Sequence, residues 1–340
     1  MSKRINTALA ILPAIAVLGL AAPASADAIS DFYKGKTVTV MVPSGLGATL
    51  GLYGRLTTEH LGKHIPGNPT VIIQSRPGGG GTKGAAFAYN AAPKDGTYIA
   101  EALAPSVLAP LLRNMKFDAS KFQWLGSIAP RPAVLSVWHT APVSDLASAQ
   151  KKESIMGSTG LGSETYLAPT LMNHIAGTKF KIVKGYKGGA KINKAMEGSE
   201  VHGRMNYWSG WTAAKAAWLA EGKLKHIVSY GGDIKELPNL PKMIDLAKTD
   251  EQKAMVRFLE VAPRVGMGFW VSPEVPKARA VALRTAFQAM LRDPAFLADA
   301  AKRKAPVSPV SGEELDKIVA AVYKTPPATI AKLKQVFGFK

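Results

Sequence analysis

The sequence contains no cysteine and is poor in acidic residues. Its 340 residues include 0 Cys, 43 Lys and Arg, and 24 Asp and Glu, which gives a formal net charge of +19 at pH 7. The absence of cysteine excludes disulfides, thiol nucleophiles, Cys-ligated zinc and iron–sulfur clusters. The basic excess favours anionic partners, such as small carboxylates, phosphates, nucleic acids or acidic membranes. With 47% hydrophobic and 20% charged residues, the chain has the composition of a globular protein and the length of about two domains.

A long apolar run occurs only near the N-terminus. Lys3 and Arg4 precede the apolar run 8–22, and residues 24–26 read Ala-Ser-Ala. This order is typical of a secretory signal peptide, since the run is shorter than the roughly 20 residues that span a bilayer. We therefore expect residues 1–26 to be a signal peptide and the rest of the chain to be exported to the periplasm and soluble after cleavage. An exported chain is not expected to bind nucleic acid, and its basic residues form no run with interleaved aromatics.

Glycine-rich turns separate strand-like segments from helix-like segments. Short β-branched or apolar runs predict strands at 37–42, 70–74, 155–157 and 180–183. The turns that follow them are 44–49, 76–82, 158–163 and 185–189. A strand that opens through glycines onto a helix presents backbone N–H groups and the positive end of the helix dipole to an anion. The repeated plan predicts an α/β fold whose turns bind an anion.

Known nucleotide and nucleophile motifs do not fit these turns. The phosphate-loop pattern fails because Lys83 follows Thr82 and no hydroxyl residue follows the lysine. The dinucleotide pattern fails because Leu50 stands where a third glycine is required. No G-x-S-x-G elbow is present, so a Ser/His/Asp site would have to be assembled from distant segments. The sequence predicts no cofactor and no catalytic residue.

Two histidines have a spacing that would suit a metal. His60 and His64 lie at i and i+4, but no Glu follows His60 and Lys63 stands between them. This departs from the zinc-binding pattern H-E-x-x-H. We expect exposed histidines at a helix end and no metal site.

Polar and aromatic residues cluster after Gly203. Arg204, Asn206 and Tyr207 put polar groups beside the apolar faces of tryptophans, which suits a pocket for an organic carboxylate. Arg204 would contact the ligand in this interpretation. It would equally pair with a structural carboxylate such as Glu200, and the sequence leaves both interpretations open.

Matches to one family run along nearly the whole chain after residue 26. The matching segments are 38–43, 60–69, 76–81, 92–97, 157–160, 185–188, 237–241 and 292–296. In this order they resemble the solute-binding proteins of tripartite tricarboxylate transporters, also called Bug receptors. The resemblance implies a type II-like, two-lobed periplasmic-binding-protein fold of the α/β class, each lobe a mostly parallel sheet flanked by helices, with the ligand in the cleft. Lobe 1 would comprise 27–132 and 229–340, and lobe 2 would comprise 133–228.

The resemblance also implies a function and a site. The protein would be a receptor and no enzyme, monomeric, which captures a small di-, tri- or aromatic carboxylate by hinge closure and delivers it to integral-membrane transporter subunits. Family members hold the carboxylate largely by backbone N–H groups of the glycine turns, and Arg204, Asn206 and Tyr207 are added from the residue pattern. The expected ligand-binding residues are Ser44, Gly45, Leu46, Gly47, Ala48, Thr49, Gly79, Gly80, Gly81, Ser158, Thr159, Gly160, Arg204, Asn206 and Tyr207.

One departure from the family pattern bears on the ligand. Many members carry an Asp where this chain has Gly51, four residues before Arg55. The absence of this Asp favours a plain carboxylate over an amino acid as the ligand. Two other functions stay open: an exported hydrolase that uses the glycine turns as an oxyanion hole, and a receptor that feeds a sensor kinase.

Overall fold

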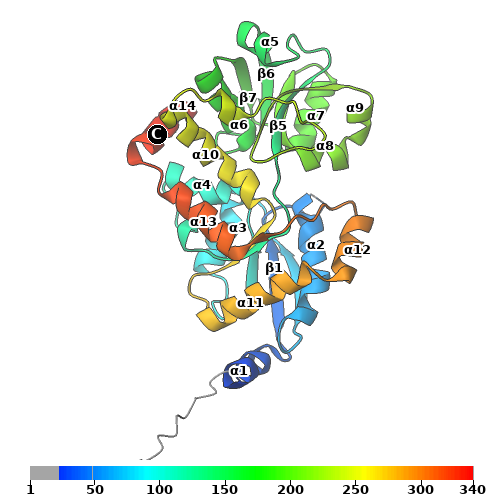
Figure 1. Cartoon of the computed structure of the whole chain (residues 1–340), viewed down its shortest axis with the longest axis vertical. Helices are drawn as coiled ribbons and strands as arrows, with labels where there is room; N and C mark the ends of the chain where they lie inside the picture. The colour runs from blue at the N-terminus through cyan, green and yellow to red at the C-terminus, as the bar shows by residue number, and fades with distance from the viewer. Residues whose placement is uncertain (1–22, 48, 340) are drawn as a thin grey trace, which may run out of the picture.

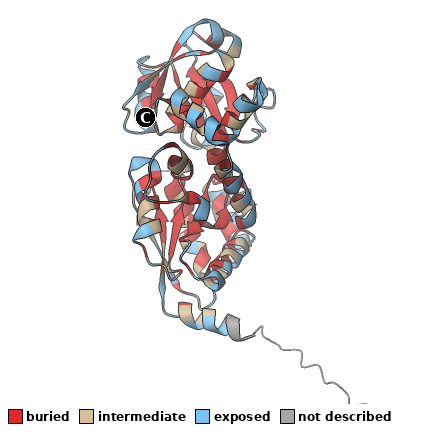
Figure 2. Ribbon diagram, turned by 90° about the vertical axis from the view of Figure 1, so that its left-hand side faces the viewer, coloured by how far each residue is buried: buried red, intermediate tan, exposed pale blue. Residues whose placement is uncertain are grey.

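The chain folds around two separate β-sheets. The computed structural model describes residues 23–47 and 49–339, and Figure 1 shows the two sheets in two lobes, one above the other. The first lobe is built on the strand order β11-β4-β10-β3-β1-β2, and the second on β7-β6-β8-β5-β9. Buried residues occupy the strands in the middle of each lobe, while exposed residues lie on the outer helices (Figure 2).

The first sheet combines both strand directions. β1 pairs in parallel with β2 and β3, whereas β10 runs antiparallel to β3 and β4, and β11 runs antiparallel to β4. β1 is a β-branched run with buried alternate residues that stops at Pro43, which has no N–H to continue the ladder. The strands are β1 (Thr37–Val42), β2 (Thr70–Ser75), β3 (Tyr98–Glu101), β4 (Gln123–Ser127), β10 (Gly268–Val271) and β11 (Val310–Ser311).

The second sheet is also mixed. β6 pairs in parallel with β7 and β8, and β5 runs antiparallel to both β8 and β9. The strands are β5 (Ala133–Trp138), β6 (Glu153–Ser158), β7 (Lys179–Lys184), β8 (Gly203–Tyr207) and β9 (Leu224–Tyr230). The expected two-lobed α/β architecture is confirmed, but the expectation of mostly parallel sheets is wrong. Each lobe receives antiparallel strands where the chain passes from one lobe to the other.

Helices flank both sheets. Around the first sheet these are α2 (Thr49–Leu61), α3 (Thr82–Asn90), α4 (Ala104–Leu112), α11 (Lys277–Met290), α12 (Pro294–Lys302) and α13 (Gly312–Tyr323). Around the second they are α5 (Leu146–Lys151), α6 (Glu164–Ala176), α7 (Gly189–Glu197), α8 (Trp208–Ala214) and α9 (Ala216–Ala220). Short 3₁₀ turns lie at Gly62–His64, Gly79–Gly81, Ala119–Lys121 and Met243–Leu246. Among the described residues, no helix has the length and apolar character needed to cross a membrane.

Two helices join the lobes. α10 (Asp250–Val265) packs on α4 and α13 of the first lobe and on α6 of the second, and α14 (Pro327–Phe337) packs on α4 and α6. A single hydrophobic core accordingly contains Trp270 of β10, Phe258 of α10 and Leu135 of β5. The predicted limits of the lobes in the sequence stay a prediction, because these two helices contact both sides.

The N-terminal helix bears on the predicted signal peptide. α1 (Pro23–Tyr33) continues through the predicted cleavage site after residue 26. Most of the predicted signal peptide lies outside the described residues, so its role stays a prediction.

Candidate functional site

A cleft lies between the glycine turns of the two lobes. It consists of two cavities of about 370 Å³ and about 200 Å³, which share Gly80, Thr159 and Ser163 in their walls. Gly79 and Gly80 belong to the first lobe, whereas Thr159 and Ser163 belong to the second. The remaining lining residues are Arg113, Gly160, Leu161 and Gly162 for the larger cavity, and Leu103, Pro105, Glu164, Thr165, Arg204, Met205, Asn206 and Tyr207 for the smaller.

A cavity elsewhere in the molecule lacks the buried charges of this cleft. One of about 260 Å³ lies between α10 and α13, and its walls include Arg257 and Arg264, which are exposed to solvent. In the cleft, by contrast, Arg204 is only 8% exposed and Glu164 only 5%. Perturbed, buried ionisable groups in a concave site are typical of functional sites. We therefore take the cleft as the candidate site.

Arg204 is a buried guanidinium that has no acidic partner among the described residues. Its Nε donates to the backbone oxygen of Met205 at 2.9 Å, and its two terminal nitrogens donate to the side-chain oxygens of Asn193 and Asn206 at 3.1 Å each. Burial lowers the pKa of Arg204 to about 10, and no acid contributes to that shift. The guanidinium is therefore charged at neutral pH among neutral oxygens. The alternative pairing with Glu200 is not formed, because Glu200 accepts a hydrogen bond of 2.6 Å from Tyr186.

The glycine turn before α7 makes room for this guanidinium. A Cβ atom on Gly189 would lie 2.2 Å from a terminal nitrogen of Arg204. Gly189 is the first residue of α7 and follows the N-cap Gly188. The turn 185–189, which the sequence singled out for anion binding, thus seats the cationic side chain.

The second glycine turn follows β2 and forms the first-lobe wall of the cleft. Four consecutive glycines, Gly78 to Gly81, have φ values of 128°, 58°, 63° and 88°, which residues other than glycine rarely adopt. A Cβ on Gly81 would lie 2.6 Å from the Cβ of Leu103. Gly79 and Gly80 line the cleft, whereas Gly81 is buried behind them.

The turn after β6 uses its backbone donors internally. The N–H of Thr159 donates to the hydroxyl of Thr165 at 3.0 Å, and the N–H of Gly160 donates to the hydroxyl of Ser158 at 3.1 Å. Thr159 and Gly160 line the cleft, and Ser158 is fully buried. The expectation that these N–H groups are open to an anion does not hold in this structure, because neighbouring hydroxyls already accept their hydrogen bonds.

None of the described residues of the first glycine turn lines either cavity of the cleft. Arg55 donates to the backbone oxygen of Leu46 at 2.7 Å, and Ser75 donates to that of Ser44 at 2.8 Å. A Cβ on Gly51 would lie 2.1 Å from the Leu46 oxygen, so this turn geometry itself requires glycine there. The remaining described members of the predicted set are Gly45 and Gly47, which are exposed, and Thr49, which is half-buried; Ala48 lies outside the described residues.

A cluster of buried charges that the sequence analysis missed lies beside the cleft. The Glu164 carboxyl accepts from the Tyr207 hydroxyl and, at 3.3 Å, from the Tyr230 hydroxyl. The Arg131 guanidinium stacks on the Tyr207 ring, 3.8 Å from its centroid. Both carboxylate oxygens of Glu101 and the Nε of Arg131 are buried without a hydrogen-bond partner among the described residues.

Burial dominates the ionisation of this cluster. It raises the pKa of Glu164 to about 8 and that of Glu101 well above its usual range, while the positive charge of Arg131 opposes both shifts. It also lowers the pKa of Arg131 to about 10, against the pull of the two acids. The cause is the loss of water around each charged form.

Comparison with known proteins decides the family. The family described as "Tripartite tricarboxylate transporter family receptor" matches residues 55–334. The chain belongs to this receptor family. A UPF0065 protein of Bordetella bronchiseptica is 26% identical over 175 residues, which is 50% of this chain and 51% of that protein. The receptor therefore spans about half the length of this curated relative.

Solved structures share the fold of the receptor. A TctC solute binding protein from Polaromonas superposes with a TM-score of 0.65 at 19% identity, covering 90% of this chain and 99% of that one. An R. palustris protein solved with adipate gives a TM-score of 0.64 at 22% identity, covering 89% and 97%. At these identities the likeness establishes the two-lobed fold.

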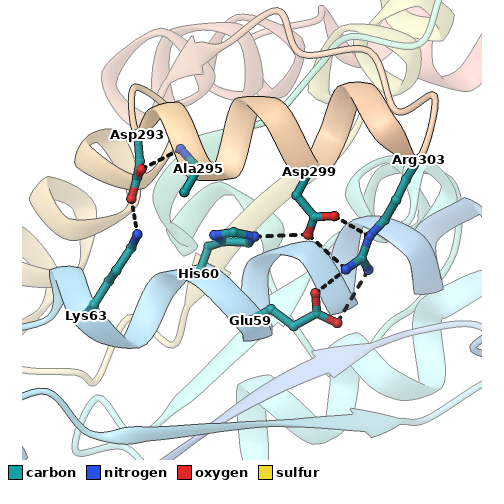
Figure 3. A network of polar contacts seen from close by, with 7 residues as sticks. All are labelled: Glu59, His60, Lys63, Asp293, Ala295, Asp299 and Arg303. Carbon is teal, nitrogen blue, oxygen red and sulfur yellow. Dashed lines mark hydrogen bonds and ion pairs between the residues drawn. The ribbon is translucent and has the colours of Figure 1, made fainter.

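The two histidines of the receptor with metal-like spacing both pair with acids of the α12 segment, and Figure 3 shows the contacts around His60. His60 lies 3.0 Å from Asp299, and these two with Glu59 place ligand atoms within 4.8 Å of one another. Arg303 donates to both carboxylates, so its guanidinium already supplies the positive charge that a metal ion would bring. His64 pairs separately with Asp293 at 3.0 Å. The expectation of exposed histidines is wrong, because α12 half-buries both.

Proposed function

We propose that this receptor binds a small organic carboxylate in its cleft, with Arg204 as the anion-binding side chain. One observation carries the proposal: a buried guanidinium that lines the cleft, lies over the Trp211 ring and, among the described residues, donates hydrogen bonds only to neutral oxygens. An ionised group taken out of water is costly unless an opposite charge compensates it. A ligand carboxylate would supply that charge.

The hydrogen-bond capacity of Arg204 fits such a ligand. A guanidinium has about five N–H donors. Three of them are accounted for by Met205, Asn193 and Asn206. The remaining donors match the two oxygens of a carboxylate, in the geometry that arginine makes with carboxylates elsewhere. The adipate in the R. palustris relative is the same class of ligand.

The family supports delivery to a membrane transporter as part of this proposal. The proposed role is that of a periplasmic solute-binding protein that closes its two lobes on the ligand and presents it to integral-membrane subunits. Lobes joined by few chain connections are suited to hinge closure around a ligand. A receptor of this kind needs a difference in ligand affinity between open and closed states and no chemical step.

Hydrolysis receives little support from the hydroxyls of the protein. The Ser136 hydroxyl lies 2.9 Å from Nδ1 of His226, but Ser136 is fully buried and also accepts from the Trp211 ring N–H. Burial lowers the pKa of His226 to about 4, with Lys225 adding to the shift. A nucleophile must reach the substrate, and a histidine base is normally oriented by a third group. Ser136 and His226 therefore form a buried structural pair.

Calorimetric titration of the protein from residue 27 onward tests the proposal. The protein is unfolded and refolded to remove any bound compound, then titrated with aliphatic and aromatic carboxylates, amino acids and neutral sugars. We expect binding of a carboxylate class, recovery of the compound unchanged, and no binding of sugars. Binding of sugars alone, or conversion of the compound, would contradict the proposal.

A variant of Arg204 tests whether the ligand binds to this side chain in the cleft or responds only to the overall positive charge of the protein. Arg204→Lys keeps the positive charge but loses the forked donors, so carboxylate affinity should fall about tenfold to hundredfold, the worth of hydrogen bonds to a charged group. Arg257→Lys is the matched control, because Arg257 is exposed and lines the cavity beside α13. Equal effects of both changes would place the anion elsewhere.

A further inference from the structure

The smaller cavity of the cleft has one basic and one acidic wall residue. Arg204 comes from β8 of the second sheet, and Glu164 is the first residue of α6. Among the residues that line the two cavities of the cleft, Glu164 is the one acid. A ligand that fills this cavity therefore meets a guanidinium on one side and a carboxyl group on the other.

The Glu164 carboxyl is held in place with acceptor capacity to spare. Tyr207 donates to one of its oxygens and Tyr230 to the other. A carboxylate offers about four lone-pair sites, so each oxygen retains one for a further donor. Because the phenols fix the orientation of the group, a ligand donor would not have to order it.

When Glu101 and Glu164 are both ionised, the one nearby cation among the described residues balances only one of them. Arg131 is the one basic group that acts on Glu164, and it acts on Glu101 as well. Two acids share one guanidinium, and the carboxylate oxygens of Glu101 have no hydrogen-bond partner among the described residues. A second ligand carboxylate placed here would be repelled by the ionised acids and would require their protonated forms. A hydroxyl or ammonium group would find an acceptor.

We propose that the ligand is a small monocarboxylate that carries a hydroxyl or ammonium group, with its carboxylate on Arg204 and its donor group on Glu164. This rests on the proposed function, and it departs from the di- or tricarboxylate that the family name suggests. It also reverses the preference for a plain carboxylate over an amino acid that was drawn from Gly51, because an acid from α6 supplies the acceptor that the first glycine turn lacks.

Ionisation of Glu164 gives the proposal a pH signature. With a pKa of about 8, the carboxyl is protonated at neutral pH in the empty cleft. An ammonium ligand favours the ionised form, so its affinity should rise by up to about tenfold per pH unit until pH reaches about 8. A second carboxylate would need the protonated form, so its affinity should fall above pH 8. The groups that face Glu164 among the described residues are Arg131, Tyr207 and Tyr230, with Glu101 beyond Arg131, and Arg113 lines a neighbouring cavity together with Glu164.

The test is calorimetry with ligands that differ at one end only. The probes are hexanoate, 6-hydroxyhexanoate, 6-aminohexanoate and adipate, together with the corresponding three-, four- and five-carbon sets and their 2-hydroxy and 2-amino isomers, each at pH 6, 7, 8 and 9. We expect a donor-bearing monocarboxylate to bind at least about tenfold tighter than the plain acid of its length, the effect of one hydrogen bond to a charged acceptor. A dicarboxylate that binds tightest, or plain acids that bind equally well, would overturn the proposal.

Glu164→Gln assigns the effect to this side chain. The amide keeps the shape but loses the charge, so the advantage of the ammonium ligand and its pH dependence should disappear, while the plain acid keeps its affinity within about twofold. Tyr230→Phe, which frees one carboxylate oxygen, is the second variant and should reduce the same advantage less. An unchanged ligand ranking in both variants would overturn the role of Glu164. Absence of binding by every carboxylate would instead overturn the proposed function itself.

Discussion

Two buried arginines beside the cleft differ in what surrounds them. Arg204 donates only to neutral oxygens, whereas Arg131 lies between Glu101 and Glu164 and stacks on Tyr207. Arg204 also lines the smaller cavity of the cleft, whereas Arg131 is not among the residues that line either cavity. The difference makes Arg204 the better candidate for an anionic ligand. Arg131 would instead organise the acidic side of the cleft.

A buried histidine gives the protein a pH dependence that is separate from the cleft. The pKa of His226 is lowered to about 4, mainly by burial, from an ordinary value of 6.5. The unfolded chain therefore binds the proton first, and the stability that the neutral ring contributes is present above pH 6.5 and lost as pH falls toward 4. The loss is on the order of 3 kcal/mol.

Urea denaturation of wild type and His226→Asn at pH 7 and pH 4 measures this contribution. We expect the free energy of unfolding of the variant to fall by roughly 2–3 kcal/mol less than that of wild type over this interval. His139→Asn is the control, because His139 is exposed. Parallel curves for wild type and His226→Asn would mean that the ring is protonated in the fold.

At the scale of elements, α12 is fixed to α2 by charge. Lys63 and His64 approach Asp293 at the start of α12, and His60 with Arg303 approaches Asp299. Asp293 also caps the helix by accepting from the N–H of Ala295 at 2.8 Å. An acidic N-cap is favourable at the positive end of the helix dipole.

Acid and salt should loosen this contact between the helices. The pKa values of Asp293 and Asp299 are lowered, chiefly by hydrogen bonds from Lys63 and His60 respectively. Stability from this source is therefore present above the ordinary carboxyl pKa of 3.8 and lost as pH falls below it.

Asp293→Asn isolates the ionic part, because asparagine also caps helices. We expect a lower melting temperature at pH 6 and a smaller drop on acidification below pH 4 than in wild type, with the difference reduced in high salt. Asp250→Asn is the matched control, since Asp250 is a fully exposed acid in the first turn of α10. Equal responses of both variants would indicate a general charge effect.

Elements were more predictable from the sequence than the site was. The run 37–42 is β1 as expected, because it is rich in β-branched residues and is followed by a proline that ends the strand. Arg204, Asn206 and Tyr207 line one cavity of the cleft. Glu101, Arg131 and Glu164 belong to three distant segments that meet only where the two lobes come together, so no spacing pattern reveals them. The hydrogen bonds that occupy the N–H groups of Thr159 and Gly160 depend on the folded position of Thr165 and Ser158, which is equally absent from the pattern.

At the scale of the whole molecule, one hydrophobic cluster passes through both lobes, while each lobe also has a cluster of its own. Met41 and Trp270 of the first sheet belong to the same buried cluster as Leu135 and Met205 of the second, with α10 between them. Proteins of two domains often unfold in separate steps. A core that passes through both lobes predicts a single step instead, because opening either lobe exposes apolar surface of the other.

Phe258 on α10 tests this coupling, since its side chain is 1% exposed within the shared core. Phe258→Ala should lower the free energy of unfolding by about 3–5 kcal/mol, the usual effect of removing a buried aromatic ring. Tryptophans lie in both lobes, among them Trp124 in β4 and Trp218 in α9, so fluorescence and far-ultraviolet circular dichroism report on both. The two signals should shift together and stay coincident in the variant. Leu297→Ala, at a side chain that is 40% exposed on α12, should change stability by less than about 0.5 kcal/mol. A transition that splits in wild type would mean that α10 does not couple the lobes, and ligand closure would then act on two independently stable halves.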